Sequence, residues 1–264
     1  MGLSPDQSRR YERHVMLPEI GEAGQERLLA SSVAMIGAGG LGSPVGIYLA
    51  AAGVGRIRAV DGDRLELSNL QRQIAHGTPD VGRPKVESFG ETVGRLNPDV
   101  ELDLVPERAS PDNVLELTEG HDLVLDCTDN FPTRYLMNDA ARLAGKPLVT
   151  GAILAYAGQV TVVRPETGAP CYRCLYPTPP GPKVARERSF AGVLGVVPGV
   201  IGTVMATEAL KALLGIGEAL VGRLLVYDAL EPSFRIIRYP ADPACALCGR
   251  DPAIERPAWI PGGP

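Results

Sequence analysis

Short apolar runs and longer segments with helical spacing follow one another along most of this chain. Apolar runs of about four to eight residues are typical of buried strands. The sequence predicts such strands at 33–36, 56–61, 100–105, 122–126, 147–150 and 158–163. Helical patterns lie between most of them, at 43–52, 85–96, 113–119 and 134–144. Because strands that alternate with helices form a mostly parallel sheet with helices on both faces, the predicted fold class is α/β.

The pattern changes in the last third of the chain. An apolar stretch at 191–206 contains Pro198 and four glycines, and we expect a buried core helix there, since it is too short and too broken to face lipid. Two strand-like runs, 223–227 and 234–239, flank a turn and predict an antiparallel ribbon. The Pro- and Gly-rich tail after Gly249 is expected to be loosely ordered.

Composition and charge exclude several classes of function. A net charge of −5, with 22% charged and 45% hydrophobic residues in 264, is ordinary for a globular protein and gives no basic excess for holding nucleic acid. The N-terminus lacks the apolar core of a signal peptide. We therefore expect a cytoplasmic protein that binds neither nucleic acid nor a membrane.

A glycine-rich turn follows the first predicted strand. Gly37, Gly39 and Gly42 have the spacing G-x-G-x-x-G between that strand and a helix, and Asp61 ends the next strand. Glycines let a phosphate approach the backbone, the helix N-terminus favours an anion, and a carboxylate about 20 residues further on can bind a ribose. The pattern predicts a nucleotide site on a Rossmann-like sheet. A tight turn without a ligand is the alternative, and the glycines and Asp61 alone would fit NAD equally well.

A long polar loop at 62–84 leaves the edge of the sheet where such folds bind ligands. We expect active-site residues in it. Lys85 then opens a helix, where the dipole disfavours a cation, so an anionic ligand would explain this lysine better than solvent does. A merely solvated lysine is the alternative.

Two carboxylates, Asp126 and Asp129, stand at the end of another buried strand. Carboxylate oxygens are the ligands that magnesium takes when it works with substrate phosphates. One of the two is therefore a candidate magnesium ligand. The alternative is that Asp129 only caps the following helix.

Four of the five cysteines form two C-x-x-C pairs, 171/174 and 245/248. In a protein without an export signal this spacing favours a metal site over disulfides. Two such pairs predict one four-cysteine zinc site, which is structural because four thiolates leave no open position. A redox dithiol and an iron–sulfur cluster are the competing interpretations.

Several motifs together resemble one family of enzymes. They are Gly37–Gly42, Ser68–Gln73, Val81–Lys85, Asp126–Asn130 and the two cysteine pairs. In this order, and over about residues 10–249, the sequence resembles the MoeB and ThiF adenylyltransferases, which are related to ubiquitin-activating enzymes. The resemblance implies a protein that binds magnesium ATP and adenylylates the C-terminal glycine of a small ubiquitin-like sulfur carrier protein ending in Gly-Gly, with release of pyrophosphate.

The resemblance also implies roles for individual residues. Gly40 would lie against the nucleotide, Asp61 would take the ribose hydroxyls and Asp129 would bind magnesium. Asn69, Arg72 and Lys85 would hold the phosphates. Arg13 would reach the ATP of a partner subunit, which implies a homodimer. The other positions implied in the cofactor site are Gly37, Gly39, Gly42, Asp63, Ser68, Gln73 and Asn130.

One departure from the family concerns a cysteine that many relatives use for a covalent intermediate. The segment 175–190 contains no cysteine here, and Arg188 stands at the corresponding place. The remaining thiol, Cys127, lies at a strand end, where a buried structural role is expected. We therefore predict an enzyme that stops at the acyl adenylate and receives sulfur from a separate donor, since no rhodanese-like segment is present in the sequence.

The predicted organisation is a single adenylyltransferase domain. It comprises an N-terminal arm (1–30), a nucleotide-binding core (31–165), a zinc-tethered part that binds the carrier (166–250) and a loose tail (251–264). An NAD-dependent oxidoreductase and an inactive carrier-binding scaffold are the alternatives. The polar loop, Lys85 and the magnesium-type carboxylate argue against the first, because a nicotinamide enzyme does not need them around one phosphate. The sequence does not identify the carrier or its pathway.

Overall fold

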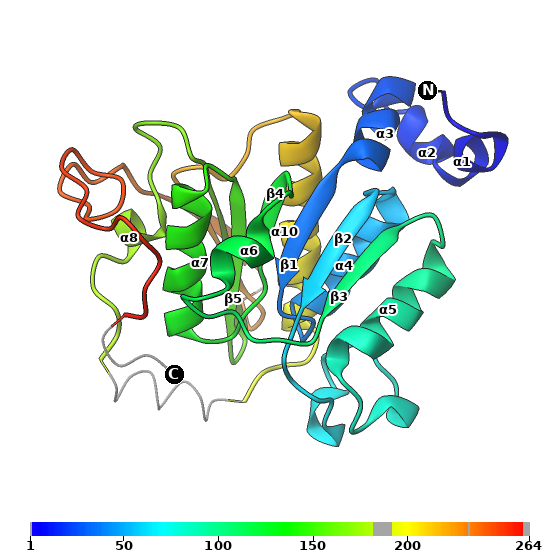
Figure 1. Ribbon diagram of the computed structural model, residues 1–264, viewed down its shortest axis with the longest axis horizontal. Coiled ribbons are helices and arrows are strands. Elements are labelled where there is room, and N and C mark those ends of the chain that lie inside the picture. Colours follow the sequence, from blue (N-terminus) through cyan, green and yellow to red (C-terminus); the bar gives the residue numbers. More distant parts are fainter. Residues whose placement is uncertain (1, 182–191, 232, 261–264) are drawn as a thin grey trace.

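Eight strands form one continuous sheet in the computed structural model, which describes residues 2–181, 192–231 and 233–260 (Figure 1). Their order across the sheet is β3-β2-β1-β4-β5-β6-β7-β8. The strands are β1 (Ser32–Ile36), β2 (Arg56–Val60), β3 (Glu101–Val105), β4 (Leu123–Asp126), β5 (Leu148–Leu154), β6 (Ala157–Val163), β7 (Arg223–Asp228) and β8 (Ser233–Arg238).

The first five strands are parallel and the last three antiparallel. The α/β prediction with a mostly parallel sheet and a C-terminal ribbon is confirmed, although the ribbon of β7 and β8 continues the main sheet through β6. Strand order reverses between β1 and β4. Ligands of doubly wound sheets bind outside the carboxyl ends of the strands at this reversal.

Helices cover both faces of the parallel part (Figure 1). The helices α4 (Gly42–Ala52), α5 (Lys85–Leu96) and α10 (Val197–Leu214) pack on one face. On the other face lie α6 (Val114–Thr118) and α7 (Phe131–Leu143). The parallel strands are therefore buried on both sides, which explains their uninterrupted apolar sequence.

Helix α10 contains most of the long apolar stretch that the sequence places in the core. Its Ile201 and Met205 are fully buried and belong to the same cluster as β1 and α4, as predicted. Among the described residues it is the one helix long and apolar enough to cross a membrane, and 56% of that window is buried inside the protein.

The N-terminal arm consists of α1 (Pro5–Arg10), α2 (Glu12–Val15) and α3 (Gly21–Ala30). It lies beside the amino end of β1 (Figure 1). The ring of buried Tyr11 fills the space beside Gly53, where an added Cβ would come within 2.7 Å of it. The Asn97 amide donates to the Tyr11 hydroxyl at 2.9 Å and to the Ala50 carbonyl at 2.7 Å. The arm is thus fixed to the ends of α4 and α5.

Two segments differ from their sequence-based expectation. Helix α7 begins at Phe131, three residues before the predicted start, because Asn130 caps it and a proline follows in the first turn. The tail from 251 to 260 forms no helix or strand, but Trp259 and Ile254 pack against the second hydrophobic cluster. It is better packed than its composition predicts.

Candidate active site

The glycine turn lies at the carboxyl end of β1, at the point where strand order reverses. Gly37 has a φ of +98°, and a Cβ on it would lie 2.8 Å from the Cys127 carbonyl oxygen. A Cβ on Gly42 would lie 1.9 Å from the Gly37 oxygen. Only glycine fits at either position, so the turn is as tight as the spacing predicts.

The turn also leaves donors free. Among the described residues, no hydrogen-bond acceptor is found for the backbone N–H groups of Gly39, Gly40 and Leu41, just ahead of α4. Helix α4 begins here without a side-chain cap. Unpaired N–H groups beside a helix N-terminus form a site for a phosphate.

The Ala38 peptide within this turn is held on both sides. Its N–H donates to the carboxylate of Asp61 at 2.9 Å, and its carbonyl oxygen lies 2.9 Å from Nε2 of His76. Burial raises the pKa of Asp61 above its usual value, against the lowering effect of Lys85 and two backbone N–H groups. Burial likewise lowers the pKa of His76, so the neutral imidazole is favoured.

Lys85 is buried at the start of α5 and its Nζ donates to Asp63 at 2.9 Å. The exposed guanidinium of Arg108 donates to the other oxygen of Asp63 at 2.6 Å. Burial alone would raise the pKa of Asp63, but the two cations outweigh it and the pKa falls below its usual value. The anion that the sequence predicts beside Lys85 is therefore, in this structure, Asp63.

The polar loop reaches the glycine turn from the other side. The side chain of Arg72 runs past Gly40, where an added Cβ would lie 3.7 Å from its Cδ, and its guanidinium donates to the Ser68 carbonyl at 3.2 Å. Gln73 is buried with its amide next to Gly39. Its Oε1 has no hydrogen-bond partner among the described residues. Asn69 lies in a short 3-10 helix and accepts from the N–H of Glu66 at 3.2 Å.

Asp126 and Asp129, the two candidate magnesium ligands, have very different surroundings. Asp126 is fully buried and accepts hydrogen bonds from Thr128 at 2.6 Å and Thr150 at 2.7 Å. It also lies 3.4 Å from the guanidinium of Arg134, so its oxygens are occupied. The carboxylate of Asp129 is exposed and makes no hydrogen bond or close ion pair among the described residues, although its charge helps to raise the pKa of Arg134. Asp129 is thus the carboxylate of this pair that is open to a ligand.

The cap of helix α7 is Asn130, not Asp129. The Asn130 side chain accepts from the Thr133 N–H at 2.9 Å. The alternative that Asp129 serves only as this cap is therefore wrong. Asn130 itself, which the family resemblance puts in the cofactor site, is engaged in capping.

Arg13 is not close to these residues within one chain. It is exposed on α2, and its guanidinium lies 3.8 Å from the sulfur of Met16. The arm sits at the far end of α4 from the glycine turn, and that helix of 11 residues is about 16 Å long. Any role for Arg13 at an ATP site must concern a second subunit.

The four paired cysteines come together at the side of the sheet. Their sulfur atoms lie within 4.8 Å of one another, with four of the separations at 3.3, 3.4, 3.7 and 3.9 Å. Four sulfurs at about 2.3 Å from one tetrahedral ion are roughly 3.8 Å apart. The cluster of Cys171, Cys174, Cys245 and Cys248 can therefore hold zinc, as the sequence predicts.

Cys127 lies beside Gly37 and is buried, and burial together with Asp126 raises its pKa well above the usual value. A thiol in such surroundings is inert. Arg188 belongs to the segment 182–191, which lies outside the residues that the structure describes.

These features define a class of protein. The sheet is doubly wound, its glycine turn and charged side chains lie where the strand order reverses, and four cysteines form a cluster. This is the architecture of a nucleotide-binding α/β protein with a structural metal site. More specifically, the chain belongs to the ThiF family, whose profile matches residues 11–247.

Curated relatives cover nearly the whole chain. The sulfur carrier protein adenylyltransferase of Thermus thermophilus is 52% identical over 247 residues, which are 92% of this chain and 91% of that protein. The SAMP-activating enzyme E1 of Haloferax volcanii is 50% identical, over 94% and 92%. The mouse adenylyltransferase and sulfurtransferase MOCS3 is 47% identical over 96% of this chain, which is 55% of that longer protein.

Among solved structures, Escherichia coli MccB with ATP is similar in fold, with a TM-score of 0.78 at 20% identity over 91% of this chain and 73% of that one. The family resemblance inferred from the motifs is confirmed. Neither the oxidoreductase nor the silent scaffold finds support among these relatives.

The sequence did not single out three residues that shape the site. His76, Arg108 and Arg134 act on the glycine turn, on Asp63 and on Asp126, respectively. His76 stands in the polar loop already marked as important, and that loop was its only signal. Arg134 and Arg108 give none, because their contacts depend on how α7 and the loop after β3 approach Asp126 and Asp63 in the folded chain.

Proposed function

We propose that this protein uses ATP to adenylylate the C-terminal glycine of a small ubiquitin-like sulfur carrier protein. The observation that carries the proposal is the meeting of three features at the carboxyl edge of the sheet: a glycine turn with unpaired N–H groups, Lys85 and the exposed carboxylate of Asp129. They occur in a chain about half identical to enzymes named for this reaction. The products are an acyl adenylate and pyrophosphate.

The carrier's terminal carboxylate attacks the α-phosphorus of ATP, the bond to the β-phosphate oxygen breaks, and the electron pair leaves with pyrophosphate. No general base is required, because a carboxylate is already ionised near pH 7. The protein's contribution is to position the two reactants and to neutralise charge that grows on the phosphates. Arg72 and Lys85 supply that positive charge, and Asp61 holds the ribose.

Lys85 can serve the phosphate without leaving its partner. Its ammonium has three donors, of which Asp63 takes one. Asp63 holds the ammonium of the buried lysine in place through this ion pair. In this proposal the path of the phosphates is lined by the turn glycines and by Ser68, Asn69 and Gln73. Asp63 acts by orienting Lys85, and Asn130 acts by capping α7.

The donor set also fits magnesium and zinc. Asp129 offers carboxylate oxygens that no internal group uses, and when bound there magnesium would add positive charge to the phosphates. Zinc would hold the four sulfurs as a structural ion. A cytoplasmic location belongs to the same proposal, because the reaction uses ATP and the thiolates must stay reduced.

The test is ATP–pyrophosphate exchange that depends on an added carrier ending in Gly-Gly. Wild-type protein should exchange label only with carrier present, and mass spectrometry should detect carrier with one added adenylyl group. Asp129→Asn should lower the exchange rate about 100-fold, because it removes one charged group from a phosphate site. Asp99→Asn, which changes an exposed carboxylate just before the amino end of β3, is the matched control and should match wild type. The proposal is contradicted if pyrophosphate exchange occurs without a carrier, or if no carrier supports it.

We further propose that Arg13 completes the site of a partner subunit in a homodimer. Arg13→Ala and Lys85→Ala proteins should each be nearly inactive. When they are mixed and allowed to exchange subunits, half of the dimers carry one intact site, so activity should return to about a quarter of the wild-type value. A role of Arg13 within its own chain predicts no recovery.

The carrier is proposed to dock on the antiparallel part of the sheet. On β8 the side chains of Phe234 and Ile236 are 57% and 48% exposed, and they share a face with Tyr227 and Leu225 of β7, their cross-strand partners. The rings of Phe234 and Tyr227 stack at 4.9 Å. Exposed aromatic and aliphatic groups on an edge strand are typical of a protein-binding surface.

The reaction is proposed to end at the adenylate, with sulfur supplied by a separate donor. Support comes from the inert surroundings of Cys127 and the occupation of the other four thiols by one cluster. After incubation with ATP and carrier, no thioester should survive electrophoresis without reductant. A reductant-sensitive adduct of this chain with the carrier would disprove this step.

A further inference from the structure

His76 connects the glycine turn to the helix that presents Lys85. Its Nε2 lies 2.9 Å from the Ala38 carbonyl oxygen and its Nδ1 lies 2.6 Å from the Ser88 hydroxyl. A carbonyl can only accept, so Nε2 carries the proton; in the neutral ring Nδ1 then accepts from Ser88. Both ring nitrogens are therefore used, each toward a different element.

The two partners of His76 belong to the two halves of the phosphate site. Ala38 lies inside the glycine turn, with its N–H fixed by Asp61. Ser88 lies on α5 one helical turn after Lys85, and its hydroxyl is also 3.4 Å from the Lys85 carbonyl. The imidazole thus spans the distance between the backbone that receives a phosphate and the helix turn that carries the ammonium.

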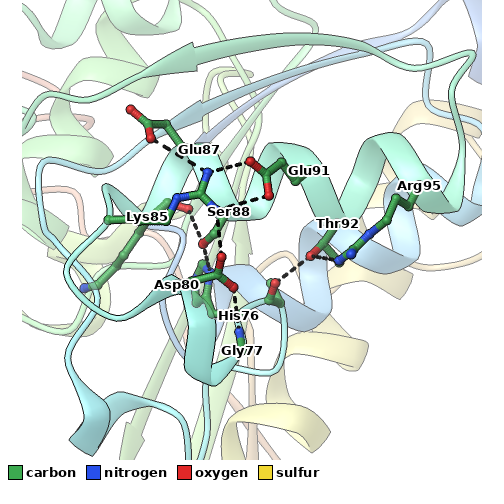
Figure 2. A network of polar contacts seen from close by, with 11 residues as sticks. His76, Gly77, Asp80, Lys85, Glu87, Ser88, Glu91, Thr92 and Arg95 are labelled. Carbon is green, nitrogen blue, oxygen red and sulfur yellow. Dashed lines mark hydrogen bonds and ion pairs between the residues drawn. The ribbon is translucent and has the colours of Figure 1, made fainter.

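The loop that carries His76 is itself fastened to α5, as Figure 2 shows. Thr92 donates to the Ala75 carbonyl at 2.7 Å. Asp80 pairs with Arg83 at 2.8 Å, and Arg83 also pairs with Glu91 on α5. The ring is held in place by these contacts, so its two hydrogen bonds transmit a fixed geometry.

We propose that His76 is a positioning residue for adenylylation, which holds the glycine turn and the Lys85-bearing helix at the spacing that one nucleotide requires. This inference rests on the proposed function, because the spacing matters to catalysis only if both elements bind the same ATP. A displacement of about 1 Å between a bound phosphate and a catalytic cation can cost about 100-fold in rate.

The experiment replaces His76 and separates binding from catalysis. In His76→Ala, kcat for carrier-dependent exchange should fall about 10- to 100-fold, while the Kd for ATP measured by calorimetry changes less than about threefold. His76→Gln retains an amide donor for Ala38 and should recover to within about fivefold of wild type. A purely structural role predicts a lower Tm without this split between kcat and Kd, and without rescue by glutamine.

His121→Gln is the matched control. His121 is also buried, but it lies at the amino end of β4, away from the turn, and its Nδ1 is 2.8 Å from the Glu119 carbonyl oxygen. Its kcat should equal that of wild type. If His76→Ala does not fold, Ser88→Ala decides, since it removes only the second hydrogen bond and should lower kcat about threefold. Unchanged kcat in the folded His76 or Ser88 variants overturns the proposal.

Two readouts do not depend on the reaction and so separate this proposal from the proposed function. Long-range ¹H–¹⁵N NMR should find the neutral His76 ring protonated at Nε2. Amide hydrogen exchange at Ala38, whose N–H is bonded to Asp61, should be faster in His76→Ala than in wild type. If wild type exchanges no pyrophosphate with any carrier, the proposed function fails. The positioning role is overturned instead if amide exchange in His76→Ala is slower than or equal to that of wild type, or if the His76 ring is protonated at Nδ1.

Discussion

The parallel and the antiparallel parts of the sheet present different kinds of surface. At the carboxyl ends of β1, β2 and β4 the polar side chains are already oriented by one another: Asp61 by backbone N–H groups, Lys85 by Asp63. On β8 the larger apolar side chains are left exposed. In the proposed function, a small nucleotide is met by a prearranged site and the carrier protein by a surface with few internal contacts.

The two regions also differ in what holds them together. The parallel strands are covered by helices on both faces and contribute to two apolar clusters, one on each face. The segments that follow β6 and β8 are joined instead by the four cysteines. A metal site can stabilise a part of a chain that buries little apolar surface.

The largest effect should come from removing the metal site. Cys248→Ser should lose zinc and destabilise the C-terminal part by about 5 to 10 kcal/mol, because three remaining thiolates hold the ion poorly. Zinc per chain, measured by mass spectrometry, and hydrogen exchange of 166–180 and 240–250 would follow this. Cys127→Ala, which touches no ligand, should keep about one zinc per chain. Equal zinc in both variants would mean that the cysteines do not form the site.

The next effect concerns the parallel region. Arg134→Met should lower the free energy of unfolding by about 3 to 5 kcal/mol, because it leaves the buried Asp126 carboxylate without its cation. Denaturant titration measures it. Arg142→Met on the same helix loses only bonds to the Arg164 and Glu166 carbonyls and should cost about 1 kcal/mol. Similar costs would show that burial of the pair matters less than we infer.

A substitution on β8 should separate the two regions functionally. Phe234→Asp should raise the KM for the carrier about tenfold and leave the Kd for ATP and the Tm nearly unchanged, since the ring is mostly exposed. Ile237→Asp is the control, because Ile237 pairs with Leu224 and so points to the other face. If both raise KM equally, the carrier does not select the face of Phe234.

The smallest effect should be in the pH dependence of stability. The pKa of His76 is lowered in the folded protein, so below about pH 6.5 the unfolded chain binds a proton that the folded chain resists. Stability then falls as pH drops from 6.5 through the folded pKa. The charge of Lys85 lowers the pKa of His76 further, whereas the charges of Asp80 and Asp61 raise it. Between pH 7 and 5 wild type should lose on the order of 2 °C more in Tm than His76→Gln. An equal loss would mean that His76 does not titrate in this range.

The sequence predicts the parallel part of the fold well, because buried strands, glycine spacing and the cysteine pairs are local patterns. Local patterns also mark Lys85 and the pair of Asp126 and Asp129, and the family resemblance then selects Asp129 from that pair. Contacts between a strand end and the helix that follows it leave no such pattern. Neither the partnership of Lys85 with Asp63 nor the buried pair of Asp126 and Arg134 could be read from spacing, since each depends on how the helix packs against the end of the preceding strand.

Helix α7 has a consequence for how the protein would respond to its surroundings. Near its start, Arg134 donates to the carbonyl oxygens of Thr128 and Gly151. One turn later, Asp139 pairs through both oxygens with Arg173, between two of the cysteines. Helix α7 therefore connects the loop of Asp129 to the cysteine cluster. Under the proposed function, loss of zinc should therefore weaken the binding of magnesium ATP as well as the packing of the C-terminal part, since one helix contacts both.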